Sequence, residues 1–99
     1  MKKVFGAHAY KMVVPSVKSI LGHPIGASGS QQMAAALMAI NESFVHPTIN
    51  YEIPDPECDL NCVSNIGESG QFRITVCNSL AFGAKTPLLS YERLFVDLW

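Results

Sequence analysis

A lysine and a histidine, Lys18 and His23, stand five residues apart just before a nearly uncharged run of small and apolar residues. Such a run is typical of a helix, so both side chains fall in a turn that leads into a helix start. Backbone N–H groups at a helix start lack an intrahelical partner and leave positive potential there. The pattern therefore predicts a site that stabilises an anion, including the anionic transition state of a reaction. The neighbouring Gly22, Gly26 and Gly29 are interpreted as structural, because glycine permits sharp turns and close packing.

The element that must position this turn is a helix that opens at Gly29 or Ser30 and runs through Asn41, with Ser28 or Ser30 as the expected N-cap. Its larger apolar side chains share one stripe: Met33, Leu37 and Ile40. Alanines and a further methionine leave its other sides apolar too, and such a helix is expected to be covered all round. Ninety-nine residues can hardly supply that cover, so the helix is interpreted as built for the interior of a larger protein or an oligomer.

Short strands are expected on either side of this helix. Residues 10–14 form an apolar run ended by Pro15, which predicts an edge strand followed by a turn. Residues 72–76 alternate apolar and polar side chains and predict a second strand. Residues 88–95 predict a third strand with weaker alternation, so the last two strands are expected to form a hairpin.

A long connection separates the helix from the hairpin. Residues 44–70 are rich in proline, asparagine and acidic side chains, which favour turns. They predict a long loop that is either ordered or disordered, and a loop of this length inside a compact domain is usually functional or supported by a neighbour. Residues 1–99 together are expected to form a single partial domain.

Composition excludes several classes of function. Seven basic and eight acidic residues leave a net charge of −1, without the basic patch that a nucleic-acid-binding protein needs. The first residues lack the unbroken apolar core of a secretory signal, and the sequence holds no apolar stretch long enough for a membrane span. We therefore expect a cytoplasmic protein, or one of an organelle matrix or plastid if the source is eukaryotic.

The cysteines and the other two histidines are assigned no chemistry. Cys58 and Cys62 are a weak zinc signal without a second pair, so no metal and no cofactor are expected. Cys77 lies at the end of a predicted strand and is interpreted as a buried, inert thiol, since free cysteine packs like a small hydrophobic residue. His8 and His46 are interpreted as ordinary surface or core histidines.

Four segments carry a resemblance to one enzyme family. Residues 18–29, K-S-I-L-G-H-P-I-G-A-S-G, resemble the K-S-x-x-G-H-x-x-G-A-A-G signature of the β-ketoacyl-acyl-carrier-protein synthases, the condensing enzymes of fatty-acid and polyketide synthesis. Residues 47–60 are similar to their P-T-I-N-Y-E-x-P-D-P-E-C-D-L run, residues 4–11 to the segment before the lysine motif, and residues 78–83 to their N-S-F-G-F-G-G loop. The chain thus resembles a C-terminal fragment, about the final quarter, of an elongating, ketosynthase II-like enzyme.

The resemblance implies the C-terminal part of a thiolase-like layered α/β fold, with one buried helix packed on a small sheet of about three strands. It also implies a decarboxylative Claisen condensation of an acyl thioester with malonyl-acyl carrier protein. His23 would donate a hydrogen bond to the malonyl thioester carbonyl, a role that suits a neutral imidazole, and Lys18 would organise hydrogen bonds and charge. The family's gating and oxyanion loop corresponds to Phe82 and Gly83, although two glycines of that pattern are alanines here.

The cysteine nucleophile and the first histidine of the family precede the matched segments, and the chain begins too late to contain them. Covalent acyl transfer needs an activated nucleophile, so the chain alone is expected to be inactive. Three alternatives stay open: a non-catalytic remnant or interaction protein that pairs with a larger synthase half, a complementing half-enzyme, and a small redox or metal module built on Cys58 and Cys62. Expected partners are acyl carrier protein thioesters, a missing N-terminal synthase half or a second copy of the chain; nucleic acid and membranes are not expected.

Overall fold

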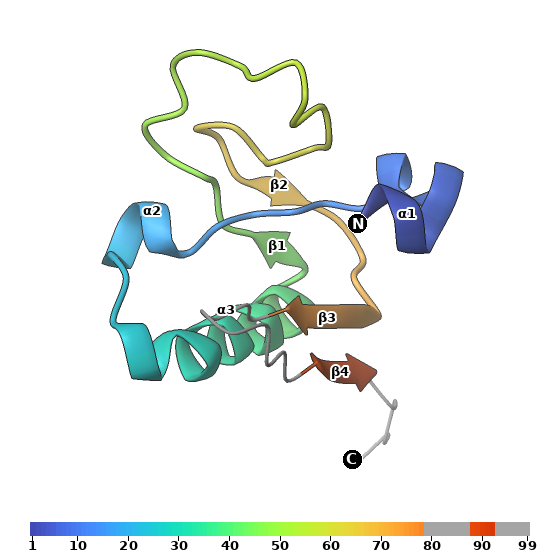
Figure 1. The fold of residues 1–99 in the computed structure, drawn as a ribbon. Coiled ribbons are helices and arrows are strands. Elements are labelled where there is room, and N and C mark those ends of the chain that lie inside the picture. The colour runs from blue at the N-terminus through green and yellow to red at the C-terminus, as the bar shows by residue number, and fades with distance from the viewer. Residues whose placement is uncertain (79–87, 93–99) are drawn as a thin grey trace.

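One long helix, α3 (Ser28–Glu42), lies beside short strands in the computed structural model (Figure 1). The structure describes residues 1–78 and, for the backbone, the strand at 88–92. The other helices are α1 (Lys2–Phe5), a 3-10 helix (Gly6–Lys11), α2 (Lys18–Leu21) and a second 3-10 helix (Ile25–Ala27), and the strands are β1 (Phe44–Val45), β2 (Glu68–Ser69), β3 (Ile74–Asn78) and β4 (Leu88–Glu92). The expected α/β class is confirmed.

The described strands form two antiparallel pairs. β1 pairs with β2, with Phe44 opposite Ser69, and β3 pairs with β4, with Ile74 opposite Glu92 and Asn78 opposite Leu88. The hairpin expected near the C-terminus is therefore confirmed, although β3 begins two residues later than the alternating pattern does. A single sheet of about three strands was expected. Within the described residues the strands instead form two separate two-stranded sheets.

The strand predicted at residues 10–14 is wrong. The 3-10 helix continues through Tyr10 to Lys11, and the Met12 N–H donates to the Ala9 carbonyl at 3.3 Å. Extended backbone begins only at Met12, and Val13 makes one isolated parallel bridge to Asn61. A short apolar run carries too few residues for its period to separate a turn of helix from a strand.

The predicted helix is confirmed as α3, which begins at Ser28 and ends at Glu42, and the capping residue Ser43 has the left-handed conformation. Ala39 of α3 is buried in a small core with Val45 and Val63, against which Val13 and Phe72 also pack. The adjacent Met38 is 65% exposed, so the described residues leave part of the helix uncovered. Within the described part of the chain, no helix has both the length and the apolar character to cross a bilayer.

Residues 44–70, which were expected to be either an ordered or a disordered loop, form an ordered one. The Thr48 N–H donates to the Val63 carbonyl at 2.8 Å, and the Asn65 N–H donates to the Thr48 carbonyl at 2.9 Å. The Asn65 side chain adds hydrogen bonds to both backbone groups of Tyr51. This loop also contacts the segment before α2, since the Val14 N–H donates to the Asn61 carbonyl at 2.7 Å.

Candidate functional site

His23 lies in the connection between α2 and α3, and its ring is held by two groups from the residues that follow it. The backbone N–H of Ile25 donates to Nδ1 at 3.2 Å, and the Ser28 hydroxyl lies 2.7 Å from the same nitrogen. A backbone N–H can only donate, so Nδ1 is the unprotonated acceptor and the Ser28 hydroxyl donates to it as well. The hydrogen-bond network thereby assigns a neutral imidazole with its proton on Nε2.

Ser28 anchors this ring to the start of the long helix. It is the first residue of α3 and is only 4% exposed. The sequence pattern predicted Ser28 or Ser30 as the N-cap, and that expectation is wrong: α3 has no side-chain cap, and the Ser28 hydroxyl bonds His23 instead. The effect is to fix the histidine beside the first residue of α3.

The connection also carries a strained residue beside the histidine. Ile25 has a φ of 48°, which is unusual for a β-branched side chain, and that side chain is 83% exposed. The unfavourable backbone conformation accompanies the hydrogen bond that the Ile25 N–H donates to His23. Strain of this kind persists where the surrounding structure requires it and is concentrated at functional sites.

The backbone conformation at residue 22 requires a glycine. It ends α2 with φ 78° and ψ −172°, a combination that is essentially restricted to glycine. Its N–H donates to the Lys18 carbonyl at 2.9 Å, which closes the single turn of α2 immediately before His23. At Gly26 and Gly29 the backbone does not have a positive φ, and an added Cβ would meet no atom within 4 Å. Only Gly22, of the three glycines, is thus confirmed in its structural role.

Lys18 begins α2 and is half-buried. Within residues 1–78 it forms no ion pair with a carboxylate, and its backbone carbonyl accepts the hydrogen bond from the Gly22 N–H. Lys18 is the first residue of α2, and His23 follows Gly22, the residue that ends it. The structure brings them to one connection without joining them by a direct hydrogen bond.

A set of hydroxyl hydrogen bonds links α2 and the residues just before it to Thr48 and Ile49. Ser19 Oγ accepts from the Ile49 N–H at 3.0 Å and donates to the Ser16 carbonyl at 2.8 Å. Thr48 Oγ1 accepts from the Ser16 N–H at 3.0 Å and donates to the Cys62 carbonyl at 2.6 Å. Two segments that are about 30 residues apart in sequence are thus assembled into one unit. Sequence reasoning missed these bonds, since small hydroxyl residues in loops carry no signal of a distant partner.

The cysteines offer no activated nucleophile. Partial burial raises the pKa of the Cys77 thiol, which keeps it protonated and supports its interpretation as an inert thiol. Cys58 is exposed and Cys62 is half-buried, and both are free thiols. In the described part of the chain, no group of three or more histidine, cysteine or acidic side chains could hold a metal ion.

The other two histidines were assigned no chemistry, and the two remaining predicted site residues fall outside the described part of the chain. His8 is exposed, and His46 bonds only the neighbouring Pro47 carbonyl, through Nδ1. Phe82 and Gly83 lie outside the described residues.

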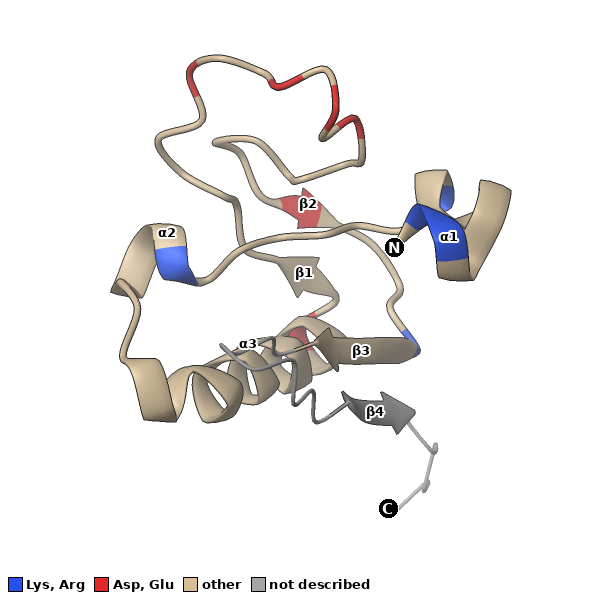
Figure 2. Ribbon diagram, in the orientation of Figure 1, with Lys and Arg blue, Asp and Glu red and all other residues tan. Residues whose placement is uncertain are grey.

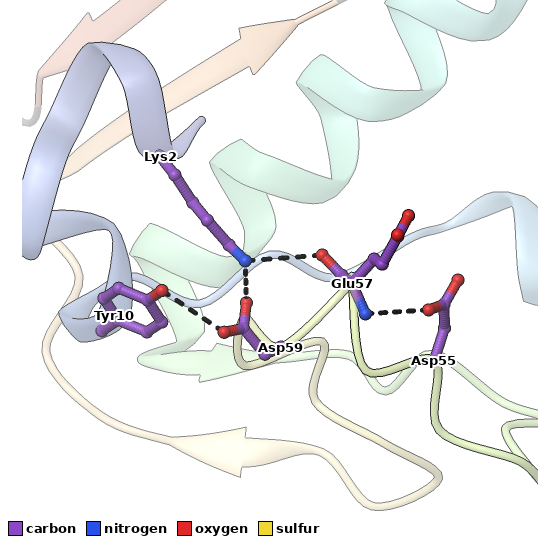
Figure 3. Close-up of polar contacts among 5 residues, drawn as sticks. All are labelled: Lys2, Tyr10, Asp55, Glu57 and Asp59. Atoms are coloured by element: carbon purple, nitrogen blue, oxygen red, sulfur yellow. Dashed lines mark hydrogen bonds and ion pairs between the residues drawn. The ribbon is translucent and has the colours of Figure 1, made fainter.

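Acidic residues gather along one loop, and lysines lie on α1 (Figure 2). The loop that includes residues 52–59 carries acidic side chains, and α1 carries lysines. Lys2 forms an ion pair with Asp59, and the Tyr10 hydroxyl donates to the other carboxylate oxygen at 3.3 Å (Figure 3). This pairing raises the pKa of Lys2 and lowers the pKa of Asp59. These contacts of Lys2 and Tyr10 with Asp59 link the N-terminal segment to the loop. Nothing in the local sequence pattern indicated them.

The fold of the chain is that of part of a ketosynthase. A ketosynthase solved bound to a hexaketide and in complex with its type II polyketide synthase acyl-carrier protein superposes with a TM-score of 0.89 at 32% identity, over 94% of this chain and 23% of that one. Residues 1–52 match the family model "Beta-ketoacyl synthase, C-terminal domain", and the chain belongs to this family. The resemblance inferred from the four motifs is therefore confirmed.

Curated relatives agree with this assignment. Nodulation protein E of Rhizobium meliloti is 40% identical over 94 residues, which are 95% of this chain and 23% of that protein. The 3-oxoacyl-[acyl-carrier-protein] synthase 2 of Synechocystis is 41% identical over 93 residues, 94% of this chain and 22% of that protein. The chain thus spans less than a quarter of the length of the relatives it matches.

Proposed function

We propose that the chain supplies the His23 and Lys18 portion of a condensing active site, which joins an acyl thioester to a malonyl group on acyl carrier protein with loss of carbon dioxide. The observation that carries the proposal is the orientation of the His23 ring, whose Nδ1 accepts two hydrogen bonds and whose Nε2–H is left as the donor. The names of the similar synthases support this reaction class and this carrier. A location in the cytoplasm or an organelle matrix is part of the same proposal.

In the proposed step, the bond between the malonyl carboxylate and C2 breaks, and carbon dioxide leaves. The electron pair forms an enolate whose negative charge lies on the thioester oxygen, and the Nε2–H of His23 donates to that oxygen. The enolate carbon then attacks the acyl carbonyl and displaces its thiolate. A preorganised donor of this kind stabilises the transition state more than the ground state, and removing one typically lowers kcat by about 10²–10³.

Lys18 acts in this proposal through its charge. Its ammonium has no carboxylate partner within residues 1–78, and it is half-buried in the turn that leads to His23. A cation in such a place adds to the positive potential of the α3 start and favours an anion beside the histidine.

The acyl group needs a nucleophile from outside this chain. All three cysteines are described as free thiols, and none of the described contacts gives one of them a cationic partner. The purified chain, incubated with acyl- and malonyl-carrier-protein thioesters, should therefore form no ketoacyl product. Product formation by the chain alone would contradict this part of the proposal.

The role of His23 is tested in a chimera. Residues 1–99 replace the matched segment of the Synechocystis synthase, which retains its remaining length, and ketoacyl product is measured. His23→Ala should lower the rate by about 10²–10³. His8→Ala is the matched control, because His8 is exposed and has no assigned role, and it should leave the rate unchanged. Full activity of the His23→Ala chimera would overturn the proposed function.

A further inference from the structure

The single helical turn α2 carries Lys18 and cannot hold this residue in place by itself. α2 spans four residues, and among the described residues no side chain caps its start. The first turn of a helix fixes several residues in return for one backbone hydrogen bond, so an isolated turn is unfavourable. The position of Lys18 therefore depends on contacts that reach α2 from elsewhere in the chain.

Those contacts meet at Ser16, two residues before Lys18. The Ser16 N–H donates to Thr48 Oγ1 at 3.0 Å, and the Ser16 carbonyl accepts from the Ser19 hydroxyl at 2.8 Å. Ser19 Oγ in turn accepts from the Ile49 N–H at 3.0 Å. Both backbone groups of Ser16 are thus fixed by hydroxyls, and the link from α2 to the ordered loop runs through Thr48 and its neighbour.

Thr48 is fixed at both its backbone and its side chain. Its hydroxyl donates to the Cys62 carbonyl at 2.6 Å. Its N–H donates to the Val63 carbonyl at 2.8 Å, and its own carbonyl accepts from the Asn65 N–H at 2.9 Å. Every polar group of Thr48 therefore has a partner, and the hydroxyl that receives the Ser16 N–H has no freedom to rotate away.

The carbonyls of Cys62 and Val63 both reach Thr48 because Val63 has a left-handed backbone, with a φ of 55°. In an extended chain consecutive carbonyls point in opposite directions, so they could not both bond one residue. A β-branched side chain rarely adopts this conformation, and Val63 is only 1% exposed. The fold thus keeps an unfavourable conformation in its small core, and the two bonds to Thr48 are what that conformation makes possible.

We infer that Thr48 is a positioning residue for Lys18: through the Ser16 N–H it holds α2 so that the charge of Lys18 acts beside His23. This inference rests on the proposed function for the role of Lys18. Within the described residues the polar atoms of Thr48 bond only backbone groups, so Thr48 acts on the reaction through Lys18. Misplacing a group in a site by about 1 Å can cost a rate factor of about 10².

The His23 ring is held independently of Thr48. Its Nδ1 accepts from the Ile25 N–H and the Ser28 hydroxyl, which follow the turn in sequence. Loss of the Thr48 hydroxyl should therefore displace Lys18 and leave the ring in place. The expected defect is a loss of the Lys18 contribution, and not a loss of the whole site.

The test uses the synthase chimera that carries residues 1–99. Thr48→Val keeps the shape of the side chain and removes its hydroxyl, and it should lower kcat by about 10–10². Thr48→Ser keeps the hydroxyl and should restore most of the rate. Thr75→Val is the matched control, because Thr75 is also half-buried and its hydroxyl makes no hydrogen bond among the described residues, and it should leave the rate unchanged.

A double-mutant cycle with Lys18→Met separates positioning from general damage. In a chimera that already carries Lys18→Met, Thr48→Val should change the rate less than about twofold, because no charge is left to position. Partial unfolding would instead lower the rate by the same factor in both backgrounds. Equal factors with and without Lys18, a full rate for Thr48→Val, or a Thr48→Ser chimera as slow as Thr48→Val would overturn the inference.

Amide hydrogen exchange of α2 gives a readout that does not depend on activity. The Gly22 N–H, which donates to the Lys18 carbonyl, should exchange at least about tenfold faster in Thr48→Val than in Thr48→Ser, because the turn loses its anchor. Equal exchange in the two variants would overturn the inference.

Failure of the proposed function and failure of this inference are distinguishable. If the His23→Ala chimera is fully active, the proposed function fails, and faster exchange in Thr48→Val would still keep Thr48 as the anchor of α2. If His23→Ala is slow while Thr48→Val has the full rate, the proposed function stands and the inference fails.

Discussion

Replacing Gly22 with alanine adds a Cβ to the residue that joins α2 to His23. With φ 78° and ψ −172°, Gly22 occupies a region that is essentially restricted to glycine. A residue with a side chain is destabilised there by about 1–3 kcal/mol. The added Cβ would meet no heavy atom within 4 Å, so no collision adds to this figure and the whole effect is local to the backbone.

The chain can respond to Gly22→Ala in two ways. If the backbone keeps its course, the free energy of unfolding falls by the full strain of about 1–3 kcal/mol. If φ turns negative, the chain changes direction just before His23, and the two hydrogen bonds to Nδ1 are lost. Each of those is worth about 0.5–1.5 kcal/mol, so the expected loss is again about 1–3 kcal/mol.

Urea unfolding of the 99-residue chain, followed by circular dichroism, measures this loss. Gly26→Ala is the matched control, because Gly26 has no positive φ and equally open space around it. That control should be neutral or gain up to about 1 kcal/mol, since alanine restricts the unfolded chain. Equal effects of the two substitutions, or an unchanged Gly22→Ala protein, would refute the reasoning about this turn.

Three further predictions concern the rest of the molecule. Gly67→Ala should lower the free energy of unfolding by about 1–3 kcal/mol, because its Cβ would lie 2.3 Å from the Phe44 ring; an unchanged urea midpoint would contradict the β1–β2 packing. The lowered pKa of Asp59 and the raised pKa of Lys2 mean that their pair stabilises the fold between the ordinary values of 3.8 and 10.5 and is lost as pH falls or rises beyond the shifted values. The stability difference between wild type and Lys2→Met should therefore be flat at neutral pH and vanish at both extremes, and a difference that persists in acid would contradict it. Alkylation of Cys77 at pH 8 should be slower in the folded chain than in urea, because burial raises its pKa; equal rates, followed by mass spectrometry, would show that the thiol is not protected.

The sequence was a good guide where local pattern decides the structure. The uncharged run around Met33 and Leu37 has only one regular conformation open to it at that length, and it forms α3. The alternation around Ile74 likewise indicated β3, although burial along the strand does not alternate: Ile74 and Asn78 are exposed and the three residues between them are half-buried. The spacing of Lys18 and His23 identified the connection between α2 and α3 as the candidate site.

The parts that could not be predicted depend on partners distant in sequence. Ser28 or Ser30 was expected to cap α3, and only the folded chain shows that the Ser28 hydroxyl bonds His23. The 3-10 helix that includes Tyr10 is fastened by Asp59, 49 residues away, and an apolar run by itself did not reveal it. Propensity is a weak prior that such tertiary contacts override.

The central claim is that His23 is a neutral donor through Nε2, and nitrogen NMR of the imidazole rings tests it most directly. A two-bond proton–nitrogen correlation spectrum of the chain at neutral pH reports which nitrogen carries the proton, and His23→Gln assigns the signals. The structure predicts an unprotonated Nδ1 and a protonated Nε2 for this ring, because the Ile25 N–H and the Ser28 hydroxyl both donate to Nδ1. A proton on Nδ1, or rapid exchange between both tautomers as in free histidine, would contradict the account.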